Sequence, residues 1–99
     1  MPARPIPVSI PTIHVARQIT ALGSTRQAEL DTFLAALQRN PYDPAVMRKC
    51  EVLWDDQFSY QLPSGSVVTW RVESLHLDGT HYLLPAWDYL SIVLVNVAF

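Results

Sequence analysis

Residues 58–72 read FSYQLPSGSVVTWRV and alternate between apolar and polar side chains on both sides of a turn-forming tetrapeptide. A period of two is typical of a strand that buries one face, and the Pro-Ser-Gly-Ser sequence at 63–66 is a turn signal. The stretch therefore predicts a β-hairpin, with one strand over 58–62 and the other over 68–72.

Two further stretches downstream favour β-structure. Asp78-Gly79, between residues 75–77 and 80–82, is the usual signal of a two-residue type I′ turn and predicts a second hairpin. The strand expected over 91–98 is apolar after Ser91 except at Asn96, and a strand that is apolar on both faces usually has neighbours on both sides.

Upstream of the hairpin the apolar period becomes helical. Residues 25–39 carry one apolar stripe, formed by Leu30, Phe33, Leu34 and Leu37. We expect Ser24 and Gln27 to form a capping box at the start of this helix, and the prolines of 40–44 to end it. A short helical turn is expected within 44–52.

An earlier helix should begin after Thr12, a candidate N-cap, and end at Gly23. Its apolar positions recur at helical spacing, at Val15, Ala16, Ile19 and Leu22. The alternation over 6–10 predicts a short strand at a sheet edge or beside a bulge, since Pro7 cannot donate to a ladder. The sequence thus predicts a single α+β domain over 1–99, with a short strand, an antiparallel helix pair and a mostly antiparallel sheet of four or five strands.

Composition places limits on the setting of this domain. Hydrophobic residues make up 49% of the 99 residues and charged residues only 16%, which predicts an apolar surface that a partner chain covers. No apolar run approaches the roughly 20 residues of a membrane-spanning helix, and the start of the chain lacks the pattern of a secretory signal. With Cys50 as the single cysteine, we expect a cytoplasmic protein with no membrane association.

Charge is divided unevenly along the chain. Residues 1–50 hold six basic and three acidic side chains, whereas residues 51–99 hold one basic and six acidic side chains, for a net charge of −2. Nucleic-acid-binding domains usually carry a basic excess, because they displace counterions from phosphates. The overall charge therefore argues against a general nucleic-acid binder.

The sequence LGSTRQAEL at 22–30 and NPYDP at 40–44, in the order strand, helix, helix and antiparallel strands, resembles the RelE/ParE superfamily of bacterial toxin components. The resemblance covers about residues 15–72 and again 92–97. It implies a toxin-like component of a type II toxin–antitoxin system, with an antitoxin protein as its partner. It implies no cofactor.

Many members of that family are ribosome-dependent mRNA endonucleases that use basic side chains. Such groups suit strand scission, since negative charge builds up on a phosphate while a base removes the 2′-hydroxyl proton. By this resemblance the candidate catalytic residues are Arg48, Lys49, Arg71 and His81.

The chain also departs from the endonuclease pattern. Val67 stands two places after Gly65, where the family carries an arginine, and Arg71 has the parity of the face opposite Trp70. Because the sequence stops at Phe99, we expect no C-terminal catalytic segment. Three alternatives stay open, of which two are an mRNA endonuclease acting at the ribosome and a non-catalytic protein-binding member, either gyrase-inhibiting or degenerate. A homodimer that pairs sheet edges is a third.

Other chemically reactive residues have simpler interpretations. His76 and His81 would face each other across the second hairpin, about 5 Å apart, and could hold a metal with Asp88 or Glu73. No further histidine and no cysteine spacing completes such a site, so two exposed histidines beside a turn are expected and no metal is predicted. Cys50 is expected to be a packed thiol.

The three tryptophans, Trp54, Trp70 and Trp87, are expected to fill the core or an interface. The adjacent carboxylates Asp55 and Asp56 would point to opposite faces of an extended segment, which favours a turn over a catalytic pair.

Overall fold

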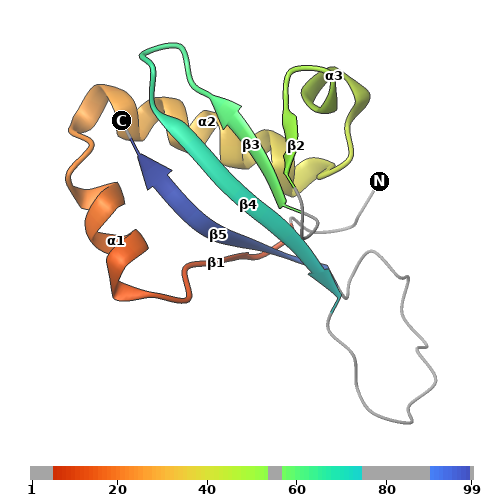
Figure 1. Ribbon diagram of the computed structural model, residues 1–99, viewed down its shortest axis with the longest axis horizontal. Helices are drawn as coiled ribbons and strands as arrows, with labels where there is room; N and C mark the ends of the chain where they lie inside the picture. The colour runs from red at the N-terminus through yellow and green to blue at the C-terminus, as the bar shows by residue number, and fades with distance from the viewer. Residues whose placement is uncertain (1–5, 54–56, 75–89, 99) are drawn as a thin grey trace, which may run out of the picture.

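Helices pack on a five-stranded mixed sheet in the computed structural model, which describes residues 6–53, 57–74 and 90–98 (Figure 1). The elements follow one another as β1 (Val8–Ser9), α1 (Ile13–Thr20), α2 (Ser24–Arg39), α3 (Pro44–Met47), β2 (Glu51–Leu53), β3 (Gln57–Gln61), β4 (Val67–Ser74) and β5 (Leu90–Ala98). The α+β class and the order of a short strand, a helix pair and a sheet are confirmed.

The strands lie in the order β1-β5-β4-β3-β2. β1 pairs with β5 in parallel, and every other described pair is antiparallel. The doubly apolar strand β5 therefore has a neighbour on each side, as its sequence predicts. In Figure 1, α2 crosses behind the sheet while α1 lies beside β5, and no described helix covers the front face.

The β3–β4 hairpin forms as the sequence predicts. Its register runs from Gln57 opposite Arg71 to Gln61 opposite Val67. The turn is closed by the Leu62 amide, which donates to the Ser66 carbonyl at 2.7 Å. Gly65 adopts a φ of 100°, a conformation that favours glycine, so the turn residue is explained by backbone geometry.

The helix pair is capped differently from the sequence prediction. Thr12 is the N-cap of α1, and its hydroxyl accepts from the Val15 amide at 3.2 Å, as expected. The capping box is wrong, because Gly23 is the N-cap of α2 and makes no side-chain cap. The Gln27 side-chain amide turns back and donates to the Ile19 carbonyl at 3.1 Å, satisfying the end of α1 instead.

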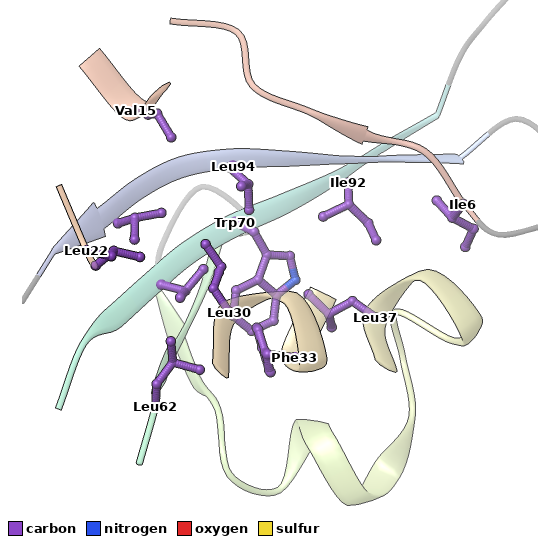
Figure 2. Packing of buried hydrophobic residues seen from close by; sticks show 12 residues of the cluster. Ile6, Val15, Leu22, Leu30, Phe33, Leu37, Leu62, Trp70, Ile92 and Leu94 are labelled. Atoms are coloured by element: carbon purple, nitrogen blue, oxygen red, sulfur yellow. The ribbon is translucent and has the colours of Figure 1, made fainter. Parts of the chain in front are cut away.

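Trp70 is the centre of the hydrophobic core. It is fully buried, and Figure 2 shows it between Ile92 and Leu94 of β5 and the apolar stripe of α2. The expected stripe residues Leu30, Phe33 and Leu37 are buried, and Leu34 packs against the same cluster. The core prediction for Trp70 is thus confirmed, whereas Trp54 and Trp87 lie outside the described residues.

Asn96, the polar exception in β5, belongs to a link between α1 and the sheet. The side-chain Nε2 of Gln18 donates to the side-chain oxygen of Asn96 at 2.7 Å. The side-chain oxygen of Gln18 accepts from the Val97 backbone amide at 2.9 Å. β1 pairs with only Ile92 and Val93, so Gln18 supplies a partner where this short neighbour has ended. A side chain of α1 therefore covers part of the β5 edge.

The segment after α2 is more extended than the sequence indicates. α3 begins after Asp43, whose carboxylate accepts from the Ala45 amide at 2.9 Å, and it ends at Met47. The expected helical turn does not reach Val52, because residues 51–53 form β2 against β3. The second hairpin and the Asp55-Asp56 turn lie outside the described residues. No helix in the described part of the chain is long and apolar enough to span a bilayer.

Candidate functional site

A groove of about 740 Å³ lies between α2, α3 and the β3–β4 hairpin. α2 contributes its face from Thr25 to Ala36, and the opposite side consists of Ala45, Val46, Lys49, Tyr60, Leu62 and Pro63. Most of these residues are apolar or small. The large hydrophobic side chains that are exposed among the described residues, Ile10, Ile13, Tyr42 and Val52, lie outside this lining, and the partner-covered surface expected from the composition stays a prediction.

Two stacked aromatic rings belong to the lining of this groove. Phe33 of α2 and Tyr60 of β3 stack with centroids 4.5 Å apart and planes within 5° of parallel. Phe33 also meets Trp70 edge to face, with centroids 5.1 Å apart. Offset and edge contacts of this kind hold rings in fixed positions, so the floor of the groove is continuous with the rigid core.

The rim of the groove is lined by small side chains. Ala28, Thr32 and Ala36 follow one another at four-residue spacing on α2, and Ala45 lies across from them on α3. Ala28, Thr32 and Ala45 are exposed, and Ala36 is half-buried. The groove is therefore open to solvent along α2. The sequence shows the row of small residues beside the apolar stripe, but it does not show which segments lie across from that row.

Two charges line the groove and they differ in their partners. The Glu29 carboxylate accepts from both the Ser64 amide at 3.1 Å and the Ser64 hydroxyl at 2.6 Å, which ties α2 to the hairpin turn. The Lys49 ammonium makes no hydrogen bond or ion pair with the described residues. Lys49 is thus a cation available to a ligand, beside α3.

The structure does not bring the three described candidate catalytic residues together. Lys49 lines the groove, and the neighbouring Arg48 donates from Nε to the Pro44 carbonyl at 3.3 Å. Arg71 follows the buried Trp70 in β4 and so lies on the other face of the sheet, where its guanidinium pairs with Glu73 at 2.8 Å. His81, the fourth candidate, lies outside the described residues.

The predicted metal pair is likewise beyond the described part of the chain. His76, His81 and Asp88 lie outside it, so their arrangement stays a prediction. Within residues 6–53, 57–74 and 90–98, no three His, Cys, Asp or Glu side chains gather as metal ligands would.

Cys50 packs as an ordinary core thiol. It is half-buried and contacts the hydrophobic cluster, and this burial raises the pKa of the thiol because the thiolate loses hydration. A reactive cysteine needs a lowered pKa, so the packed-thiol interpretation is favoured.

A scan against protein-family models and searches of curated proteins and of solved structures find no match to this chain. The arrangement of the residues themselves therefore carries the functional argument.

Proposed function

We propose that this chain is the toxin-like component of a toxin–antitoxin pair and acts through protein contacts, with the groove as the surface that a partner protein covers. The observation that carries the proposal is the groove itself, an open and mostly apolar surface beside the hydrophobic core. Binding sites in proteins are concave and mostly apolar with a few polar groups, which is how this groove is lined.

The positions of the basic side chains favour protein contacts over RNA cleavage. An endonuclease must place several cations around one phosphate, because charge develops there in the transition state. Here Lys49 faces the groove, whereas Arg71 lies on the opposite face of the sheet and is already paired with Glu73. The alternative, cleavage of mRNA at the ribosome by Arg48, Lys49, Arg71 and His81, has less support from this arrangement.

Induction of the chain in a bacterial host, with and without the protein encoded by the neighbouring reading frame, tests the proposal. Growth and mRNA integrity are followed in the same cultures. We expect arrest with intact mRNA when the chain is expressed alone, and relief when the neighbour is expressed with it. Gyrase supercoiling activity in the arrested cells then tests one protein target.

Variants separate the two mechanisms in this assay. Arg71→Ala should leave arrest unchanged, since the proposal gives Arg71 no role in binding. Loss of arrest in that variant, or cleaved mRNA with the unaltered chain, would favour the endonuclease. Normal growth in all cultures would contradict a toxin-like role.

A further inference from the structure

We infer that this chain forms a homodimer through the outer edge of β2, in which Val52 of one copy pairs with Val52 of the other across a two-fold axis. The homodimer does not depend on the proposed function, because β2 contributes no residue to the lining of the groove. Three features of the chain lead to it: the unequal protection of the two sheet edges, the outward backbone groups of Val52 and the charges on either side of β2.

The two edges of the sheet are protected to different degrees. β1 and β2 are its outer strands (Figure 1). Pro7 and Pro11 flank β1, which is only two residues long, and beyond its end the Gln18 side chain occupies a backbone amide of β5. Short strands and prolines are devices by which proteins prevent an edge from pairing. β2 contains no proline, and no described strand pairs with its outer side, so its edge is the one open to a further strand.

The alternation of hydrogen bonds along the sheet gives Val52 outward backbone groups. The Leu62 amide donates to the Ser66 carbonyl, so Leu62 and every second residue before it in β3 bond to β4. Ser59 therefore bonds on the other side of β3, where it lies opposite Glu51. Val52 is the next residue of β2, so its amide and carbonyl are directed to the outer side of the strand.

The register of the dimer follows from which backbone groups are free. In an antiparallel pair centred at Val52, the Val52 amide of each copy donates to the Val52 carbonyl of the other. A centre one residue earlier would require the Cys50 amide, which already donates to the Met47 carbonyl at 3.2 Å. The Val52 side chain is 73% exposed, and the two copies would cover each other about 5 Å apart. Glu51 then faces Leu53 of the other copy and no like charge directly.

The sequence around β2 is self-complementary in charge. Arg48 and Lys49 precede Val52 by four and three residues, and Asp56 and Asp55 follow it at the same distances. Asp55 and Asp56 lie outside the described residues, so only their order in the chain is used. Two antiparallel copies bring the basic end of each toward the acidic end of the other, whereas parallel copies would bring like charges together. A second copy of this chain therefore fits the edge.

The homodimer should be a weak one. β2 is three residues long, so the described part of its edge supplies only the two backbone hydrogen bonds of the Val52 pair. Interfaces below about 1,200 Å² are typical of transient complexes. We therefore expect the dimer to be populated at about 1 mM protein and largely dissociated at about 1 µM.

Sedimentation velocity of the full chain across this range of concentration tests the inference. Val52→Pro removes the outward amide, and proline is tolerated at an edge position whose amide has no partner within the sheet. Val52→Thr is the matched control, because it keeps the amide and a β-branched side chain. We expect Val52→Pro to weaken dimerisation at least about tenfold and Val52→Thr to leave it within about threefold. Circular dichroism and thermal unfolding check that each variant folds.

Charge reversals test the register without altering the backbone of β2. Lys49→Glu and Asp55→Lys should each weaken the dimer about fivefold at low salt and less at high salt, since exposed charges are screened. The double variant exchanges the two signs and should return to within about twofold of the unaltered chain. Arg17→Glu is the control, because it makes the same change of net charge on the exposed side of α1, which lies beside β5 (Figure 1).

Hydrogen exchange identifies the edge directly, since protection of the Val52 amide should rise with the concentration of the chain. A monomer at every concentration would overturn the inference, as would a dimer that Val52→Pro leaves intact. Equal weakening by Arg17→Glu and Lys49→Glu would contradict the register. Protection of the Val52 amide only after another protein is added would assign the edge to a strand of that protein. None of these results alters the growth assay, so the proposed function stands or falls separately.

Discussion

Replacing Phe33 with alanine should be among the most destabilising single changes in the described part of this protein. The ring is 8% exposed, stacks on Tyr60 and meets the edge of Trp70. Phe→Ala substitutions in protein cores cost about 3–5 kcal/mol, combining lost burial with the cavity left behind. Because Phe33 also lines the groove, the new space opens to solvent and the cavity contribution is smaller, so we expect about 3 kcal/mol.

Urea unfolding, followed by tryptophan fluorescence and circular dichroism together, measures this loss. For a domain of this size, about 3 kcal/mol lowers the melting temperature by about 12–24 °C. Phe33→Leu is the control, since it keeps an apolar side chain on α2 and should cost less than half as much. A loss below about 1 kcal/mol for Phe33→Ala, with an unchanged m-value, would refute the packing that joins the groove to the core.

Three further changes test other parts of the structure. Gln18→Ala should destabilise the fold by about 1–2 kcal/mol in urea unfolding, because it removes the partners of Asn96 and of the Val97 amide at the β5 edge; a change below about 0.5 kcal/mol would contradict this role. Gly65→Ala should cost about 1–2 kcal/mol through its φ of 100° alone, since no atom lies within 4 Å of the added Cβ, and Gly65→Asn should cost less. Cys50 should react with iodoacetamide more slowly than glutathione does at pH 8, because burial raises the pKa of its thiol. Its reaction rate should increase only when the pH exceeds the pKa of an ordinary cysteine. A rate equal to that of glutathione would contradict the packed thiol.

The sign of the Cys50 effect on stability follows from the same burial. The folded state favours the neutral thiol, so its contribution is fully present below the pKa of an unfolded cysteine. That contribution is lost as the pH rises from the unfolded pKa through the raised folded value. Stability measured against pH should therefore fall on the alkaline side, and Cys50→Ser should reduce this fall.

Local patterns in the sequence were sufficient for the main elements. The alternation over 58–72 around the turn predicts the β3–β4 hairpin, and the stripe at Leu30, Phe33 and Leu37 predicts the buried face of α2. Thr12 is recognisable as a cap because a hydroxyl before a helical run can accept from the first free amides. Each of these features depends on residues that are close together in the chain, so the order of the residues already specifies it.

The capping of α2 shows where local reasoning stops. Ser24 and Gln27 have the spacing of a capping box, yet Gln27 donates to the carbonyl of Ile19 in the preceding helix. A capping box would satisfy free amides at the start of α2, whereas the observed hydrogen bond satisfies a free carbonyl at the end of α1. Which of the two forms depends on how the two helices are placed relative to each other. β2 was missed for a similar reason, since residues 51–53 become a strand through pairing with β3 and carry no strong pattern of their own.

The sequence by itself determined the class of the fold and the buried stripe of α2, because these follow from periodicity. Only the tertiary structure decided where the groove lies and which charges border it. The groove joins α2, α3 and the hairpin, and the separation of Lys49 from Arg71 is set by the two faces of the sheet. Such juxtapositions depend on packing between segments distant in the chain, for which a single sequence contains no direct signal.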